Sequence, residues 1–264
     1  MAPAVTAAGE LLDLATDAAA AAADLLLAGV RTARTSVLTK TTVTDMVTEM
    51  DHASEALIRD HLLGARPRDG FLGEETGLTT GDSGIRWVVD PLDGTTNYLY
   101  GFPGWNISIA AEDDTGAVAA VVADPLAGDV FTATRGGGAR RNGAPIACSD
   151  QSDLATALCA TGFAYAPARR RAQATVLTAV IDRIRDIRRG GAAAVDLCSV
   201  ACGRVDAYWE RGLGPWDLAA GSLIAGEAGA TVAGDADLGF TLAAPPALFG
   251  PLRDLLARAG AAEA

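Results

Sequence analysis

The amino-acid sequence predicts an α/β protein (α+β layered) in which helices and sheets are stacked on one another. Three observations lead to this fold class. Two helical patterns occupy the chain up to residue 63, short β-prone runs follow between residues 85 and 148, and helical and strand patterns alternate from about residue 155 onward. With 264 residues, half of them hydrophobic, the chain can bury a large core. We expect two intimate halves, residues 1–150 and 151–264.

The N-terminal region predicts two helices. The apolar run from Ala18 to Val30 contains Asp24 and is too short to span a bilayer, so we interpret it as an amphipathic helix. A second helix is expected from about Asp51 to Leu63, where apolar residues recur with the 3.6-residue period of a helix. Both helices should cover a sheet that the next segments form.

Four β-prone runs bounded by Gly, Pro and Asp predict that sheet: IRWVVD, NISIAAED, AVAAVVAD and DVFTATRG. The segment RNGAPIACS follows them and contains an Asn-Gly pair, which suits a tight hairpin. Short strands joined by tight turns pair antiparallel, so we expect an antiparallel sheet in the first half.

The second half returns to alternation. We expect strands near residues 154–163 and 204–210, and helices near residues 172–184, 192–203 and 217–230. This order favours a second sheet with helices on its faces.

Composition excludes some classes of function. The net charge of −12 and the pI near 4.5 argue against a nucleic-acid binder, which needs a basic face. No Lys or Arg precedes Arg31, so the cationic region of a secretory signal is missing. The four cysteines form no C-x-x-C pair and read as reduced thiols. We expect a cytoplasmic protein with no membrane span.

Carboxylates follow apolar segments at several points of the chain. In WVVDPLDGTTNY, Asp90 and Asp93 end an apolar strand, where an unpaired charge costs several kcal/mol and needs a partner. Glu74 follows an apolar Phe-Leu pair, and Asp217 stands at the start of a helix. Taken singly, the Asp-Pro-Leu-Asp-Gly stretch could be a turn, Glu74 a solvated loop residue and Asp217 an N-cap.

Together these residues predict a site for a hard cation. Asp90 and Asp93 can turn toward one point, the Leu92 carbonyl adds an oxygen, and Gly94 lets the backbone approach a ligand. If Gly94 and Thr95 open a short helix, their N–H groups face the same place and can hold a phosphate. Metal and phosphate would then share one site.

The sequence resembles the inositol monophosphatases, within the magnesium-dependent, lithium-sensitive phosphatase superfamily. The resemblance rests on KTTVTDMVTEMDHASEALI, FLGEE, WVVDPLDGTTNYLYGFP and the long segment from RRGGAAAVDLCSVACG through GPWDLAAGSLIAGEAGA, in an order and spacing that fit nearly the whole chain. It implies an αβαβα sandwich, a homodimer, and hydrolysis of a small polyol phosphate monoester, with inositol monophosphate as the expected substrate.

The resemblance also implies roles for residues. Two to three Mg²⁺ ions per active site would be held by Glu74, Asp90, the Leu92 carbonyl, Asp93 and Asp217. Thr95 and Glu74 would orient the attacking water, with Asp51 hydrogen-bonded to Thr95. Gly94 and Thr95 would contact phosphate, Ala193 and Glu210 would contact the polyol hydroxyls, and Lys40 would help to hold the most weakly bound metal.

Alternatives stay open. Relatives in the superfamily act on histidinol phosphate, fructose 1,6-bisphosphate or 3′-phosphoadenosine phosphates, and some bacterial relatives contact the transcription machinery, so a binding or regulatory protein with this fold is a second class. A structural metal-binding module is a third. The stretch GFAYAPARRRAQ lacks the serine that some animal members place near the substrate, and its run Arg169–Arg171 reads as a solvated face.

Overall fold

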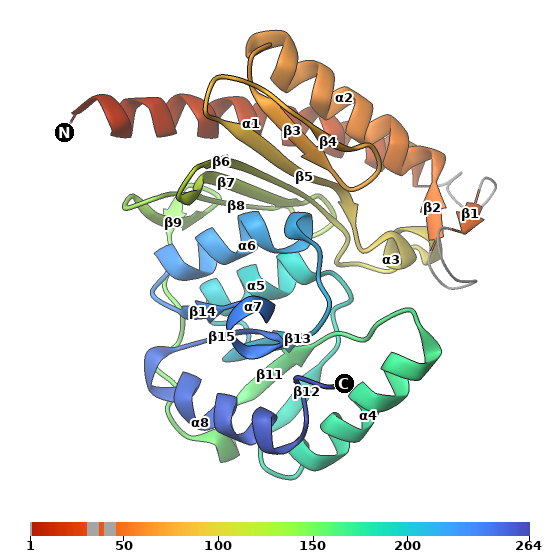
Figure 1. Ribbon diagram of the computed structural model, residues 1–264, viewed down its shortest axis with the longest axis vertical. Coiled ribbons are helices and arrows are strands. Elements are labelled where there is room, and N and C mark those ends of the chain that lie inside the picture. The colour runs from red at the N-terminus through yellow and green to blue at the C-terminus, as the bar shows by residue number, and fades with distance from the viewer. Residues whose placement is uncertain (1, 31–36, 40–45) are drawn as a thin grey trace.

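The computed structural model describes residues 2–30, 37–39 and 46–264. Helices and sheets alternate in layers over this part of the chain (Figure 1). Helices α1 (Ala2–Gly29) and α2 (Glu49–Ala65) form the outer layer on the larger sheet, and α5 (Ala193–Ala201) and α6 (Pro215–Glu227) lie between the two sheets. Helices α4 (Pro167–Val180) and α8 (Pro246–Arg258) cover the far face of the smaller sheet. The αβαβα sandwich is confirmed.

The larger sheet has eight strands among the described residues, in the order β10-β9-β8-β7-β6-β5-β3-β4. Their bounds are β3 Gly70–Gly73, β4 Gly77–Thr79, β5 Arg86–Asp93, β6 Asn106–Asp113, β7 Gly116–Asp124, β8 Asp129–Thr134, β9 Gly138–Arg141 and β10 Ala144–Pro145. Asn142 and Gly143, both with positive φ, make the expected tight hairpin between β9 and β10.

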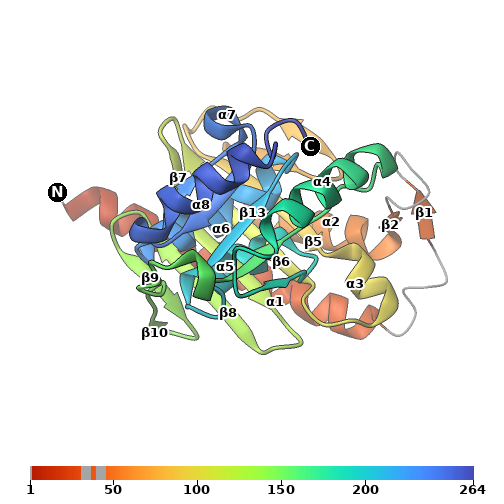
Figure 2. The ribbon, with the colours of Figure 1, turned by 90° about the horizontal axis from the view of Figure 1, so that it is seen from below.

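The smaller sheet runs in the order β12-β11-β13-β15-β14. Its strands are β11 Leu158–Thr161, β12 Asp186–Arg188, β13 Ala207–Glu210, β14 Thr231–Ala233 and β15 Thr241–Ala244. The short elements are β1 Val37–Thr39, β2 Met46–Thr48, α3 Thr95–Tyr100, α7 Asp235–Leu238 and a 3₁₀ turn at Leu154–Thr156. Figure 2, seen from below, shows α4 and α8 lying over this sheet.

Apolar side chains fill each space between layers. Leu26 of α1, Ile58 of α2 and Trp87 of β5 are fully buried in the outer core, and each fully buried aliphatic side chain of this kind contributes roughly 1.5 to 3 kcal/mol. The middle core gathers small residues of α5 and α6, such as Ala194 and Ala220, and this lets both helices fit between the sheets.

One expectation about the larger sheet was wrong. The sheet is mixed rather than antiparallel, because β3 pairs parallel with β5, with Gly70 opposite Arg86 and Gly73 opposite Val89. The chain leaves β3 through the edge strand β4 and then passes through residues 80–85 before it enters β5 in the same direction as β3. Strand β3 therefore lies directly beside β5, and the residue that follows β3 reaches the end of β5.

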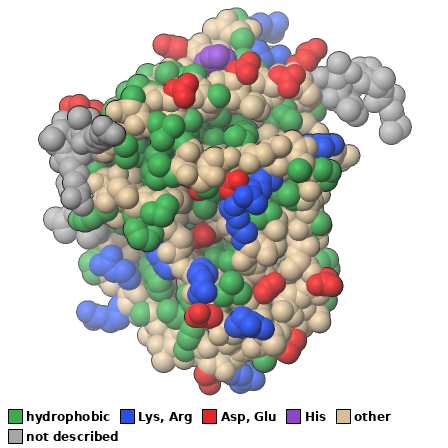
Figure 3. Space-filling view, turned by 180° about the vertical axis from the view of Figure 1, so that it is seen from behind, with side chains coloured by type: hydrophobic (Ala, Val, Ile, Leu, Met, Phe, Trp, Pro, Cys, Tyr) green, Lys and Arg blue, Asp and Glu red, His purple; other side chains and the backbone are tan. Residues whose placement is uncertain are grey.

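The helices and the surface of the described part of the chain give two further observations. No described helix combines the length and the apolar character that crossing a bilayer requires. The face seen in Figure 3 carries Lys and Arg side chains interspersed with Asp and Glu, without one continuous basic surface.

Candidate active site

A distortion in β5 brings two aspartates together. In a regular strand, residues three apart point to opposite faces of the sheet. The pairing of β5 with β6 shifts between Asp90, which lies opposite Ser108, and Asp93, which lies opposite Asn106. The extra residue on the β5 side allows both carboxylates to turn to the same side. The Pro91 carbonyl in this irregular stretch accepts a hydrogen bond from Ser54 Oγ at 2.9 Å, which ties the bulge to α2.

The third carboxylate of the cluster comes from the second half of the chain. Asp217 lies in the first turn of α6, and the Gly214 backbone N–H donates to its Oδ2 at 2.6 Å. Ligand oxygens of Asp90, Asp93 and Asp217 all lie within 4.8 Å of one another. The interpretation of Asp217 as an N-cap was wrong, because Gly214 is the N-cap and Asp217 is the third residue of the helix. Its side chain accepts from the N-cap N–H and also joins the cluster.

Glu74 and Leu92 line the same cavity as the three aspartates. This cavity has a volume of about 330 Å³ and also contacts Thr95. Glu74 follows β3 directly, and its backbone N–H donates to the Val89 carbonyl at 3.2 Å, which holds the loop beside β5. The parallel pairing of β3 and β5 thus brings Glu74 to the cluster.

Thr95 begins α3 and is buried. Its Oγ1 lies 3.1 Å from Asp51 Oδ1 and 3.2 Å from the Leu92 carbonyl oxygen, and either oxygen can accept its proton. Gly94, which precedes the helix, has φ 86°, a conformation that side chains other than glycine rarely adopt. The chain can therefore turn from β5 into α3 within one residue, as the sequence predicts.

Burial and mutual repulsion disfavour the charged forms of the carboxylates in and beside the cluster. Burial raises the pKa of Asp90 well above its usual value, and the charges of Glu74 and the other aspartates raise it further. Burial also raises the pKa of Asp217 and of Asp93. For Asp93, hydrogen bonds from Asn106 Nδ2 at 2.9 Å and the Ala194 N–H at 2.8 Å oppose the rise.

A divalent cation fits this donor set. All the side-chain donors are carboxylate oxygens, which Mg²⁺ and Ca²⁺ prefer, and they come from three separate segments of the chain that the fold holds at one point. A bound cation would compensate the negative charges of these carboxylates, whose burial otherwise costs free energy.

A second cavity of about 290 Å³ opens beside the cluster. Asp93 and Asp217 border it, and its lining includes three of the four residues that the family resemblance assigns to substrate contacts: Gly94, Ala193 and Glu210. The fourth, Thr95, lines the cavity of the acidic cluster instead. Glu210 ends β13, and Tyr208 Oη donates to its Oε2 at 2.7 Å, which fixes the orientation of the carboxylate. Three of the expected substrate residues therefore lie around one cavity next to the acidic cluster.

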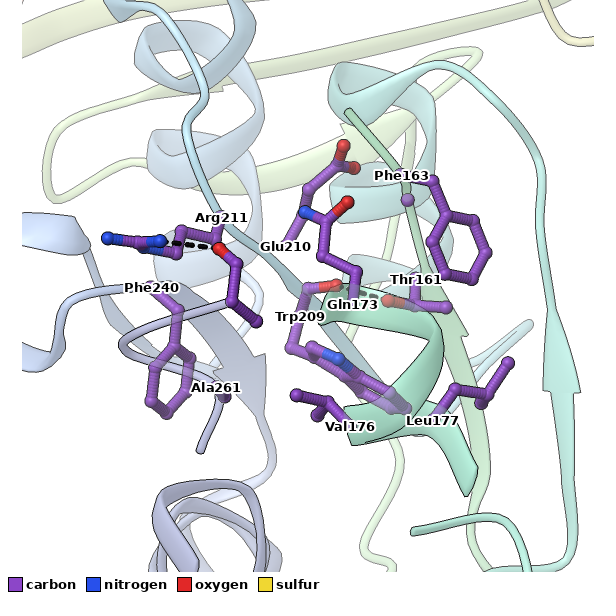
Figure 4. A pocket seen from close by; sticks show the side chains of 12 residues that line it. Thr161, Phe163, Gln173, Val176, Leu177, Trp209, Glu210, Arg211, Phe240 and Ala261 are labelled. Carbon is purple, nitrogen blue, oxygen red and sulfur yellow. Dashed lines mark hydrogen bonds between the residues drawn. The ribbon is translucent and has the colours of Figure 1, made fainter. Parts of the chain in front are cut away.

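A narrow pocket lies on the other side of Glu210 (Figure 4). Its volume is about 20 Å³, room for about one water molecule. In the view of Figure 4, the apolar side chains of Trp209, Val176 and Leu177 lie at the opposite end of the pocket from the Glu210 carboxylate. This pocket is too small for a polyol. The candidate substrate site is therefore the cavity of about 290 Å³ lined by Gly94, Ala193 and Glu210, called the wider cavity below.

The sequence analysis missed several residues that hold or line the site. Asn106 holds Asp93, but only the strand register shows that they are neighbours, so no sequence signal pointed to it. The run Arg169–Arg171 is exposed, as expected for a solvated face, yet Arg169 also lines the wider cavity together with Arg189 and Tyr165. Lys40 lies outside the described residues.

The fold and the site define a class: a layered α/β protein with a carboxylate cluster suited to a divalent cation beside a cavity of about 290 Å³. The family model of the inositol monophosphatase family matches residues 8–262. The chain belongs to the inositol monophosphatase family.

Individual relatives cover most of the chain. It is similar to the protein named inositol-1-monophosphatase of Mycobacterium leprae, 46% identical over 206 residues, which are 75% of this chain and 71% of that protein. It is also similar to the protein named Nus factor SuhB of Xylella fastidiosa, 42% identical over 216 residues, 81% of this chain and 78% of that one. The crystal structure of the extragenic suppressor protein suhB from Bartonella henselae superimposes with a TM-score of 0.87 at 35% identity, over 94% of this chain and 98% of that chain.

Proposed function

We propose that this protein is a Mg²⁺-dependent phosphatase that hydrolyses the monoester of a small polyol, inositol monophosphate in particular. The observation that carries the proposal is the convergence of Asp90, Asp93 and Asp217 within 4.8 Å beside a cavity of about 290 Å³. Family membership and the name of the Mycobacterium leprae relative support the substrate class.

The metal would be held by Glu74, Asp90, the Leu92 carbonyl, Asp93 and Asp217. When bound, Mg²⁺ screens the charge of the phosphate dianion, lowers the pKa of a water molecule and stabilises the leaving alkoxide. Four carboxylates balance two ions, and a substrate phosphate adds about two further negative charges. We therefore propose two resident ions and a third that binds weakly, together with substrate and with help from Lys40.

Side chains of the protein would orient the water and the phosphate. The Thr95 proton points to Asp51 or to the Leu92 carbonyl, which leaves the lone pairs of Thr95 Oγ1 free to accept a hydrogen bond from the nucleophilic water. Glu74, on the opposite loop, would accept the second proton of that water. The N–H groups of Gly94 and Thr95 at the start of α3 would donate to the phosphate oxygens.

Recognition of the alcohol would belong to the wider cavity. Glu210, held by Tyr208, is an acceptor for hydroxyl protons, and the backbone of Ala193 lies along the same wall. Such acceptors favour a polyol over an apolar alcohol, because each additional hydroxyl of a polyol offers a proton that they can accept.

Further proposals concern the whole protein. Residues 1–150 and 151–264 would be two halves of one active site, since Asp217 and Glu210 come from the second half and the other ligands from the first. We also propose a homodimer in the cytoplasm, as the family resemblance implies.

Phosphate release from a panel of phosphate esters tests the function. With Mg²⁺ present, inositol 1-phosphate should be hydrolysed faster than histidinol phosphate or a 3′-phosphoadenosine phosphate. Absence of release from every ester would refute the proposal, and a preference for the amino alcohol or the nucleotide would refute the substrate class alone.

The Xylella fastidiosa relative named Nus factor SuhB favours a second candidate function, a regulatory contact with another protein. The two functions are separable, because such a contact does not require the acidic cluster. If the purified protein shows no turnover but its loss from its own host still alters gene expression, the regulatory role replaces the enzymatic one.

A further inference from the structure

One face of α2 carries three buried polar side chains: Asp51, Ser54 and Glu55. They stand at positions i, i+3 and i+4 of the helix, and residues at this spacing are neighbours on one helical face. Asp51 contacts Thr95 at the start of α3, and Ser54 donates to the Pro91 carbonyl in the bulge of β5. Glu55 bonds a third segment of the site, the turn of residues 74–76 that follows β3.

Glu55 holds this turn through two backbone groups. The Glu75 N–H donates to Glu55 Oε2 at 2.8 Å, and the Thr76 N–H donates to Oε1 at 2.9 Å. Hydrogen bonds to an ionised carboxylate are stronger than those between neutral groups, and Glu55 is only 1% exposed. Because both oxygens are engaged by two successive N–H groups, the position and the orientation of the turn are both fixed.

Gly73, the last residue of β3, allows Glu55 to approach the strand. A Cβ at Gly73 would overlap the carboxylate of Glu55, so a residue with a side chain could not stand there unless Glu55 moved away. The end of β3 and the buried face of α2 therefore fit each other at the point where the turn begins.

Glu74 lies between two fixed points. Its own N–H donates to the Val89 carbonyl of β5 at 3.2 Å, and the next two N–H groups of the chain are held by Glu55. Its side chain, which lines the cavity of the acidic cluster, therefore starts from a backbone that β5 and α2 both hold. Displacement of this backbone would move the Glu74 carboxylate relative to Asp90 and Asp93.

We infer that Glu55 is a positioning residue for Glu74, which it holds in place to bind metal and to accept a proton from the attacking water. Since Asp51 on the same face contacts Thr95, α2 sets both residues that would meet that water. The part of this inference that concerns water rests on the proposed function. The part that concerns the turn and the metal rests on the fold alone.

A double-mutant cycle tests whether Glu55 acts through Glu74. Glu55→Gln keeps the size of the side chain but turns an N–H group toward one of the two donors. It should lower kcat about tenfold and change KM by less than about twofold. In the Glu74→Gln background the same change should lower kcat by less than about twofold, because the residue through which Glu55 acts is already lost. Equal losses in both backgrounds would overturn the inference.

Ile58→Val is the matched control. Ile58 lies almost one turn further along α2 and is fully buried in the outer core, so the variant should lower the melting temperature by loosening the same helix. It should leave kcat unchanged. A loss of kcat as large as that of Glu55→Gln would assign the effect to the packing of α2 and overturn the inference.

Hydrogen exchange in the metal-free protein, followed by NMR, provides a readout that needs no turnover. The amides of Glu75 and Thr76 should exchange at least about tenfold more slowly in the wild-type protein than in Glu55→Gln. The wild-type measurement alone is decisive even if the variant does not fold. Two amides that exchange as fast as free peptide groups would overturn the inference.

Calorimetric titration of Mg²⁺ into the metal-free proteins extends the cycle to binding. Glu55→Gln should weaken Mg²⁺ binding about tenfold in the wild-type background and by less than about twofold in Glu74→Gln. Equal losses in both backgrounds, or no measurable binding of Mg²⁺, would overturn the inference. If the cycle holds and no ester is hydrolysed, the proposed function fails and the positioning role stands. If esters are hydrolysed and the two losses add, the positioning role fails and the function stands.

Discussion

Asp93 connects the two halves of the molecule at the level of single atoms. Its Oδ2 accepts hydrogen bonds from Asn106 Nδ2 on β6 and from the backbone N–H of Ala194 on α5. One carboxylate oxygen therefore fixes the larger sheet and the middle helix layer to the same point, and the other oxygen is available for a ligand. Replacement of the charge should affect function more than stability, because an amide oxygen can accept the same two hydrogen bonds.

Asp93→Asn should accordingly lower phosphate release at saturating Mg²⁺ by about a hundredfold or more, because it removes a ligand charge from a preorganised site. Circular dichroism and the melting temperature should stay close to those of the wild-type protein. Near wild-type turnover in the folded variant would show that Asp93 is not a catalytic ligand.

Glu74 and Glu210 allow chemistry and recognition to be separated. Glu74→Gln should mainly lower kcat, because Glu74 would act on the water in the transition state. Glu210→Gln should mainly raise KM and change the ranking of polyol phosphates, because Glu210 lines the substrate cavity but is not one of the three carboxylates that converge in the cluster. Steady-state kinetics on several esters decide the matter, and identical effects of both variants on every ester would contradict this division.

At the scale of elements, the acidic site depends on short irregular segments that join regular ones. The bulge in β5, the turn at Gly94 and the first turn of α6 each present one or two ligands. The regular strands around them are fixed by ion pairs elsewhere. Asp129, buried at the start of β8, receives Arg141 Nε from β9 at 2.7 Å and Arg204 Nη2 from the segment after α5 at 2.5 Å.

Asp129 should make stability depend on pH. Burial alone would raise the pKa of Asp129, but hydrogen bonds and charges of Arg141 and Arg204 outweigh it, so the pKa in the folded protein is lowered. The contribution of this carboxylate is therefore full above the unfolded-state pKa, near 3.9, and is lost as pH falls through the lower folded-state value. Asp129→Asn should cost about 1 to 3 kcal/mol at pH 7.

Thermal melts of both proteins between pH 7 and pH 2 measure this effect. The difference in melting temperature between the wild-type protein and Asp129→Asn should be constant near neutral pH and shrink under acid. A difference that stays the same at all pH values would assign the effect to packing instead of charge.

The sequence predicts most of the long, strongly patterned elements but only some of the short ones, such as β11 and β13. IRWVVD and NISIAAED alternate or run apolar long enough to indicate β5 and β6, whereas β3, β12 and β14 have three or four residues and no measurable period. Helix α8 was not predicted, and it contains Pro251, which normally ends a helix. In the site, carboxylates within one motif were predictable, but the role of Asn106 depends on strand register, which no local pattern contains.

At the scale of the whole molecule, the site lies where layers meet. Asp90 and Asp93 come from the larger sheet, Glu74 from the turn that follows β3 of that sheet, and Asp217 from the helix layer between the sheets. Charges that repel one another in the metal-free protein are thus held together by the packing of both halves. A cation that binds only to the folded arrangement must stabilise the entire fold.

Addition of Mg²⁺ should therefore raise the melting temperature of the metal-free protein. The free energy of unfolding should rise by about 2.7 kcal/mol when Mg²⁺ is present at a hundred times its dissociation constant. Asp93→Asn, which has lost a ligand charge, should gain much less. Differential scanning calorimetry with and without Mg²⁺ measures both, and equal gains in the two proteins would place the metal elsewhere.

The most direct test of the central claim, that the acidic cluster is a catalytic Mg²⁺ site, is phosphate release from inositol 1-phosphate as Mg²⁺ is returned to exhaustively chelated protein. We predict no turnover at the start and a sigmoidal rise of the rate with Mg²⁺, because resident ions must bind before the weaker third ion completes the site. Full turnover by the chelated protein, with no response to added Mg²⁺, would contradict the claim.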